Sequence, residues 1–180
     1  RSAEDCEIVL AALYGRDPLD PTTNDVPFMP ASGAIENLKI AKLESDIQSD
    51  KASRRGKNVI EAVEMLESRL NTRFDTLSLP RNYPYRAFDI ILRAESGAFF
   101  DELVRSGQVD VMVEQDQGSR ANSLRQARFI PAVEYLQANR ERSRLIEEIN
   151  TLFKDYDVII APSVRSNQLQ ITNLTGHPVI

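Results

Sequence analysis

The sequence predicts an α/β fold with a mixed, mainly parallel sheet covered by helices in α/β/α layers. Short apolar segments alternate along the chain with long helical segments, which is the order that a parallel sheet with crossover helices requires. Residues 158–161 are wholly apolar, which is typical of a strand covered on both faces. We expect sheet strands near residues 38–43, 74–79 and 158–162, covered by helices near 51–70 and 131–153.

The first element is a helix that begins at Ser2. Asp5 follows three residues later, so the Ser2 hydroxyl can accept a backbone N–H as in a capping box. Apolar residues then recur at helical spacing, and Gly15 supplies a left-handed stop. Cys6 is the one cysteine, which excludes an internal disulfide. Because Cys6 occupies one of the apolar positions, we expect a buried, unreactive thiol.

The remaining elements follow a loop rich in Pro and Thr over residues 17–37. The helix at 51–70 has one apolar stripe: Val59, Val63, Leu66 and Leu70. A helix is predicted over 85–105 and ends at Gly107. Its predicted inner face consists of Phe88, Leu92, Phe99 and Leu103. Residues 109–113 alternate valines but are too short to assign. Pro131 suits the first turn of the helix over 131–153.

Composition excludes several function classes. The chain has 180 residues and a net charge of -5, which argues against a nucleic-acid surface because phosphate binding needs clustered cations. It contains no apolar run of about 20 residues, the length that a membrane span requires. One histidine and one cysteine cannot supply an ordinary zinc site. We therefore expect no ordinary zinc site, no nucleic acid and no membrane partner.

Familiar catalytic motifs are missing. The sequence contains no Gly-x-Ser-x-Gly elbow and no glycine-rich phosphate loop. A Ser–His–Asp triad would have to use His177, which lies beside Pro178. We favour a structural role for His177 in a turn, where Asn173 would bond the backbone.

Five segments nevertheless occur in a recognisable order. They are Arg-Ser-Ala-Glu-Asp with Tyr-Gly-Arg-Asp-Pro-Leu-Asp (1–5 and 14–20), Leu-Lys-Ile-Ala (38–41), Tyr-Leu-Gln-Ala-Asn-Arg-Glu-Arg (135–142), Asp-Val-Ile-Ile-Ala-Pro-Ser (157–163) and Asn-Leu-Thr-Gly-His-Pro (173–178). Together they resemble the C-terminal part of amidase-signature hydrolases, and the resemblance covers essentially the whole chain.

The resemblance implies a partial amidase-signature fold, with residues 1–180 forming the C-terminal portion of a single amidase domain. It implies hydrolysis of a carboxamide to carboxylate and ammonia or an amine through a serine acyl-enzyme, with no metal or organic cofactor. The Ser–Ser–Lys triad of the family is expected upstream, so no catalytic residue is assigned here and these 180 residues alone are expected to be inactive. The implied partners are a small-molecule amide and the N-terminal half of the same domain, and a homo-oligomer is compatible with it.

Two other functions remain open. One is the amidase-like subunit of a tRNA-dependent amidotransferase, in which a Ser-Ser-Asn-Leu-x-Arg-Tyr-Asp-Gly-like segment usually follows a glutamate. Glu95 is followed instead by Ser-Gly-Ala-Phe-Phe-Asp-Glu-Leu, so this function ranks second. The other is a non-catalytic interaction domain. Residues 163–172 form a shorter loop than relatives usually have, and either the loop is genuinely short or residues are missing.

Two charged residues interrupt apolar stripes and are the buried-charge candidates. Glu95 lies between Leu92 and Phe99, and Arg142 lies on the apolar face of its helix. Charged residues are rarely buried unless they are paired. We expect both to be mostly buried and satisfied by each other or by loop backbone, with Asp157 as another partner for Arg142.

Aromatic residues gather around the third helix. Phe99, Phe100 and the segment from Tyr83 to Tyr85 could border an acyl or leaving-group pocket. This hypothesis predicts a preference for an apolar or aromatic amide.

Overall fold

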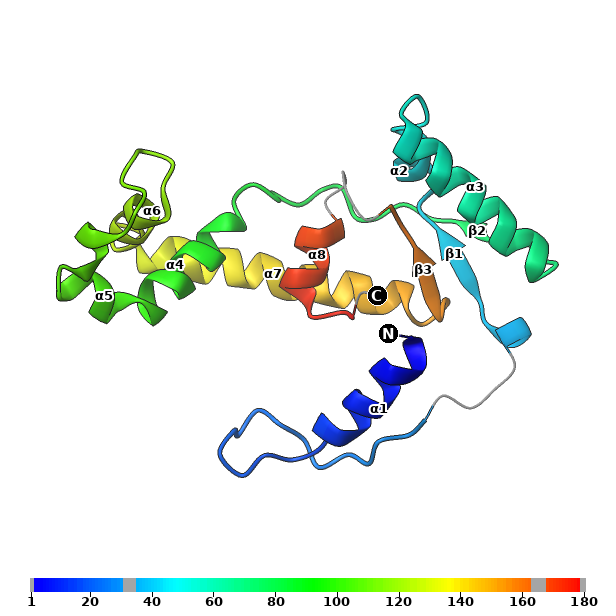
Figure 1. The fold of residues 1–180 in the computed structure, drawn as a ribbon, viewed down its shortest axis with the longest axis horizontal. Coiled ribbons are helices and arrows are strands. Elements are labelled where there is room, and N and C mark those ends of the chain that lie inside the picture. Colours follow the sequence, from blue (N-terminus) through cyan, green and yellow to red (C-terminus); the bar gives the residue numbers. More distant parts are fainter. Residues whose placement is uncertain (1, 31–34, 163–167, 179–180) are drawn as a thin grey trace. The chain divides into compact units, whose positions relative to one another are not determined.

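A computed structural model describes residues 2–30, 35–162 and 168–178. The chain forms two compact units, residues 1–37 and 38–180, and Figure 1 shows the elements of each. The first unit contains α1 (Ala3–Leu13) and the short 3-10 helix η1 (Ile35–Asn37). No helix of the described residues is long and apolar enough to cross a membrane.

Helix α1 has the predicted capping box. The Asp5 N–H donates to Ser2 Oγ at 3.2 Å, and the Ser2 N–H donates to Asp5 Oδ2 at 2.8 Å. Cys6 is exposed, as are the other residues of α1. The prediction of a buried thiol is therefore wrong, because helical spacing fixes which side chains share a face but not whether anything covers that face.

The second unit contains a parallel sheet of three short strands, β1 (Ile40–Lys42), β2 (Asp75–Thr76) and β3 (Val158–Ile160), in the order β2-β1-β3. The predicted parallel α/β arrangement is confirmed. The central residue Ala41 is fully buried, whereas Val158 is 39% exposed. The expectation that β3 is covered on both faces is wrong for the described residues, because Val158 is exposed and Ile159 and Ile160 are only half-buried. Strand β3 also pairs there on one side only and lies at the edge of the sheet (Figure 1).

Two helices connect β1 to β2. Helix α3 (Arg54–Arg69) matches the predicted helix, and Ser53 Oγ caps it by accepting the Gly56 N–H at 3.0 Å. Helix α2 (Glu44–Gln48) is an element that the sequence patterns do not indicate. Together with the strands these helices bury a small core built around Ile47, Val63 and Phe74. A Cβ atom at Gly56 would lie 2.0 Å from the Asp50 backbone oxygen, so this turn requires glycine.

The helix predicted over residues 85–105 is divided. Helix α4 (Asp89–Phe99) ends where Phe100 leaves helical geometry with φ -98° and ψ 21°, and α5 (Asp101–Arg105) follows. Gly107 adopts φ +76° and ends α5 as predicted. Val109 and Val111 form part of a 3-10 helix, η2 (Gln108–Val111), whereas Val113 lies beyond its end.

Helix α6 (Arg120–Ala127) was missed by the sequence analysis. Its sequence is largely polar and has no clear apolar stripe, although Ser119 is a recognisable cap whose Oγ accepts the Asn122 N–H at 3.2 Å. Helix α6 packs closely on α4, where a Cβ atom at Gly97 would lie 2.5 Å from the Ala127 Cβ.

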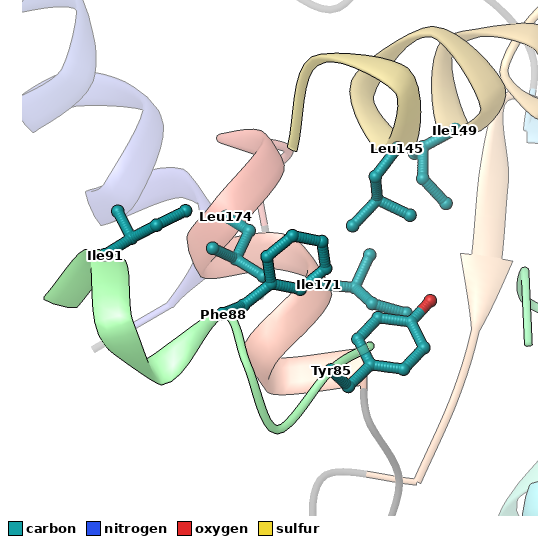
Figure 2. Packing of buried hydrophobic residues seen from close by; sticks show 7 residues of the cluster. All are labelled: Tyr85, Phe88, Ile91, Leu145, Ile149, Ile171 and Leu174. Atoms are coloured by element: carbon teal, nitrogen blue, oxygen red, sulfur yellow. The ribbon is translucent and has the colours of Figure 1, made fainter. Parts of the chain in front are cut away.

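The main core joins α7 (Ala132–Leu152), which was predicted, to α8 (Gln168–Thr175). Its buried members come from α7, α8, α4 and the segment just before α4: Tyr85, Phe88, Ile91, Leu145, Ile149, Ile171 and Leu174. Figure 2 shows the α7 side chains pointing toward α8 and the segment that precedes α4.

The segment predicted as a short loop and a turn is partly helical. Of the loop expected over residues 163–172, residues 163–167 lie outside the described residues, and the rest belongs to α8. The prediction of a turn at residues 173–178 is wrong in its first part, because α8 continues to Thr175. Gly176, with φ +76°, then ends the helix.

Candidate functional site

A groove of about 420 Å³ is lined by residues from α4, α7 and α8. We call it the α4–α8 groove, and its lining residues are Phe88, Asp89, Ile91, Leu92, Glu95, Arg142, Leu169, Gln170, Asn173 and Leu174. It brings Glu95 and Arg142, the two charged residues singled out by sequence, to the same hollow. Its volume lies in the range that small-molecule sites occupy.

Arg142 is held in place by the end of helix α8. Leu145, one turn further along α7, is fully buried, which fixes the orientation of that face of α7. Arg142 is half-buried, and its Nε donates to the Leu174 backbone oxygen at 2.5 Å. Leu174 lies in the last turn of α8, where carbonyl groups lack helical partners and cations are favoured.

Asp157, the other predicted partner of Arg142, bonds to the residues before β1 instead. Its Oδ2 atom accepts the backbone N–H of Lys39 at 2.8 Å, which ties the start of β3 to the residues before β1. Within the described ranges, Asp157 forms no bond with Arg142.

Glu95 is exposed, so the prediction that it is mostly buried is wrong. The stripe assigned to the inner face of α4 points largely outward, with Leu92 61% and Phe99 82% exposed. The prediction is confirmed for Phe88, which is buried, but the buried face continues through Ile91 and not through Leu92. The partner of Glu95 is neutral: the Tyr135 hydroxyl donates to Glu95 Oε1 at 3.3 Å.

Glu95 and Arg142 therefore border one groove without forming an ion pair with each other or with another residue of the described ranges. Each has a neutral hydrogen-bond partner. By contrast, Asp89, which also lines the groove, is already paired with Arg93 one turn along α4. Among the described residues, Glu95 and Arg142 are thus the two groove charges that lack a counter-ion.

The walls of the groove are apolar. Phe88, Ile91 and Leu174 are buried and form part of the core, while Leu92 and Leu169 are both 61% exposed. Gln170 is tied down because its Nε2 donates to the Tyr85 backbone oxygen at 2.5 Å. The groove thus combines an apolar surface with one carboxylate and one guanidinium.

The sequence analysis missed the contribution of α8 to this groove. Leu169, Gln170 and Asn173 lie on a segment interpreted as loop and turn. The spacing of Ile171 and Leu174, two buried residues three positions apart, was the available helical signal.

The aromatic candidates do not line the groove. The Tyr83 hydroxyl donates to Glu148 Oε2 at 2.8 Å, and the Tyr85 hydroxyl donates to the Pro80 oxygen at 2.6 Å. Burial raises the pKa of each tyrosine to about 12. Phe100 instead lies 5.8 Å from the Arg120 guanidinium, measured to the ring centroid.

His177 has structural partners. Its Nδ1 lies 2.8 Å from Thr175 Oγ1 and its Nε2 lies 3.1 Å from Asn150 Oδ1, while the ring stacks on Phe153 with centroids 5.0 Å apart. None of these contacts is a carboxylate or a serine. The arrangement ties the segment after α8 to the end of α7 and is not that of a catalytic triad.

A second hollow, of about 640 Å³, surrounds Lys42 at the end of β1. Lys42 Nζ lies 2.8 Å from Glu67 Oε1, and both side chains are mostly buried. The hydrogen bond between them raises the pKa of Lys42 and lowers the pKa of Glu67. Because these charges satisfy each other, we regard the pair as structural.

Catalytic groups of the expected kind are not found in the described residues. No lysine there is hydrogen-bonded to a serine, as the Ser–Ser–Lys chemistry would require. No cluster of three or more His, Cys, Asp or Glu that could hold a metal occurs in the described part of the chain.

A family model described as Amidase matches residues 1–179. The chain belongs to the amidase family. The resemblance inferred from the five sequence segments is thus confirmed for this amidase chain.

Curated relatives of the amidase chain include a glutamyl-tRNA(Gln) amidotransferase subunit from Bacillus licheniformis, which is 26% identical over 203 residues. The match covers 99% of this chain and 42% of the relative. The corresponding protein from Halalkalibacterium halodurans is 26% identical, with 99% of this chain and 42% of the relative covered. The amidase chain therefore spans about two fifths of the length of these relatives.

A solved structure shares the fold of the amidase chain. It is described as a vestigial protein complex that reveals the evolutionary origins of an s-triazine catabolic enzyme, with inhibitor bound. The TM-score is 0.66 at 24% identity, and the match covers 89% of this chain and 34% of the other. This likeness supports the partial α/β amidase fold.

Proposed function

We propose that the protein to which this chain contributes hydrolyses a carboxamide to a carboxylate and ammonia or an amine. The observation that carries the proposal is the family match over residues 1–179. In this proposal the chain is the C-terminal portion of a single amidase domain, and the rest of that domain supplies the catalytic groups.

The proposed chemistry is covalent catalysis by serine. A lysine, acting through a bridging serine, takes the proton of the nucleophilic serine, which attacks the amide carbon. The leaving nitrogen is protonated and departs, and water then cleaves the acyl-enzyme. We propose that this triad lies outside the 180 residues, and the lack of a Ser–Lys hydrogen bond among the described residues is compatible with that proposal.

A second candidate is a component of an amidotransferase, which the names of the curated relatives favour. The segment after Glu95 argues for the first candidate. Where the transferase-like segment would lie, the chain has the break between α4 and α5, and Asp101 is engaged by Arg105 and Arg128.

Ammonia release by the full-length protein distinguishes the two candidates. Acetamide, benzamide and a charged dipeptide amide are each supplied alone, and we expect release from at least one, with the apolar or aromatic amide preferred. Residues 1–180 expressed alone are the control and should release none. Ammonia that appears only from glutamine in the presence of partner subunits and charged tRNA would replace the first candidate by the second.

A further inference from the structure

We infer that the α4–α8 groove is a binding site for a small zwitterion with an apolar body, such as an apolar α-amino acid. The inference goes beyond the proposed function and does not depend on it. It starts from the two opposite charges, Glu95 and Arg142, that border one groove and lack a counter-ion among the described residues.

The charge pattern selects the head group of the ligand. Glu95 offers a carboxylate to an ammonium group, and Arg142 offers a guanidinium to a carboxylate, with which it can form paired hydrogen bonds. Arg142 uses Nε for the Leu174 oxygen, so its terminal nitrogens remain as donors toward a ligand. A ligand with one charge would leave the other protein charge without a partner.

The apolar residues that line the groove indicate that the rest of the ligand is apolar. Leu92 and Leu169 expose most of their side chains and supply the apolar surface, whereas Phe88, Ile91 and Leu174 also line the groove but are almost fully buried in the core. Burying apolar surface of a ligand against these residues favours binding, because it removes that surface from water. The groove volume of about 420 Å³ suits a ligand of amino-acid size.

The anchoring of Arg142 prepares the site. Its Nε bond to the end of α8 restrains the guanidinium before any ligand arrives, which reduces the entropy lost on binding. Glu95 is held more loosely, by the 3.3 Å contact from Tyr135, and is accessible from solvent.

Calorimetric titration of the full-length protein with phenylalanine tests the inference. Phenylalanine should bind more tightly than phenethylamine, which lacks the carboxylate, 3-phenylpropionate, which lacks the ammonium, and glutamine, which lacks the apolar body. Equal affinity for all four, or no binding of phenylalanine, would overturn the assignment.

Variants then attribute the binding to the two charges. Glu95→Gln should weaken phenylalanine binding about tenfold or more, as expected for loss of a hydrogen bond to a charged group, and should strengthen binding of 3-phenylpropionate. Glu147→Gln, at an exposed position of α7 outside the groove, is the matched control. Arg142→Lys should retain partial affinity and Arg142→Met should lose it. Because Glu95 is exposed, its variant remains informative even if Arg142→Met does not fold.

Thiol protection shows whether the ligand occupies this groove. In a Leu92→Cys variant, phenylalanine should slow modification of the new thiol, followed by mass spectrometry of the peptide that carries it. A thiol introduced by Glu147→Cys should react at an unchanged rate. Equal protection at both positions, or none at position 92, would show that phenylalanine binds elsewhere. Ammonia release is measured separately, so failure of the proposed hydrolase function and failure of this site give different results.

Discussion

Replacing Glu67 by Gln removes the negative charge of the ion pair between Lys42, on β1, and Glu67, on α3. Glu67 Oε1 accepts both the Lys42 ammonium at 2.8 Å and the Phe74 N–H at 2.9 Å, so one carboxylate holds the end of β1 and the start of the β2 segment. The side chains of Lys42 and Glu67 are 15% and 14% exposed. A Gln can keep the Phe74 bond, but Lys42 then retains only Glu44, at 3.5 Å, among the described carboxylates. We expect the free energy of unfolding to fall by about 1.5–3 kcal/mol, the range for a hydrogen bond to a charged group.

The pH dependence of this loss identifies its cause. Glu67 has a lowered pKa in the folded protein, chiefly because of the Lys42 hydrogen bond, so its contribution is present above about pH 4.3 and disappears as the pH falls through the folded pKa. Lys42 has a raised pKa, so its contribution is present below about pH 10.4 and disappears as the pH rises through the folded value. The difference between wild type and variant should therefore be largest between these limits.

Denaturant unfolding of the full-length protein at several pH values measures the effect. Glu64→Gln is the matched control, since Glu64 lies one turn earlier on α3 and is exposed. A Glu67→Gln protein as stable as the Glu64→Gln control at neutral pH, or a loss that does not shrink in acid, would refute the reasoning.

Three further changes test the packing by the same unfolding measurement. Gly97→Ala places a methyl group 2.5 Å from the Ala127 Cβ and should lower the free energy of unfolding by about 1–3 kcal/mol. Adding Ala127→Gly should recover part of this loss. If the effects of the two substitutions simply add, the contact between these residues is contradicted. Gly56→Ala places a methyl group 2.0 Å from a backbone oxygen and should be more damaging than Gly97→Ala, so a smaller loss would show that this turn relaxes. Tyr83→Phe removes the 2.8 Å bond to the Glu148 carboxylate and should cost about 0.5–1.5 kcal/mol, below the range for charged groups because this bond is exposed to solvent. Since the pKa of Tyr83 is raised to about 12, wild-type stability should fall as the pH rises above about 10, where unfolded tyrosine ionises, and the variant should show less of this fall.

Much of the fold follows from local sequence patterns. The capped helix α1, the long helices α3 and α7, and the three strands were predictable because caps, apolar periodicity and strand–helix alternation are local properties. The glycines at 107 and 176 take up left-handed geometry at element ends, although the second was assigned to a turn and not to a helix end.

The errors arise where tertiary packing decides. The face of α4 that is buried is set by α6, α7 and α8, so the stripe through Leu92 and Phe99 was a misleading guide to the inner side. Helix α6 was missed because its buried face, which consists of Ala121, Leu124 and Ala127, carries only one large apolar side chain and so gives a weak stripe in the sequence.

The groove was predictable only in part. Sequence reasoning selected Glu95 and Arg142, but it could not show that they border one hollow without pairing, since their separation depends on how α4 and α7 cross. The same limit applies to Asp157, whose partner is the Lys39 backbone and not Arg142.

Trapping of the acyl-enzyme tests the central claim most directly. The full-length protein is quenched with acid during turnover of benzamide, digested, and searched by mass spectrometry for a benzoyl group on serine, with protein quenched in the absence of benzamide as the control. We expect the adduct on a serine outside residues 1–180, and no such adduct in the control. A benzoyl adduct on a serine within residues 1–180 would contradict the proposed placement of the catalytic serine, and steady ammonia release with no adduct at all would contradict the acyl-enzyme.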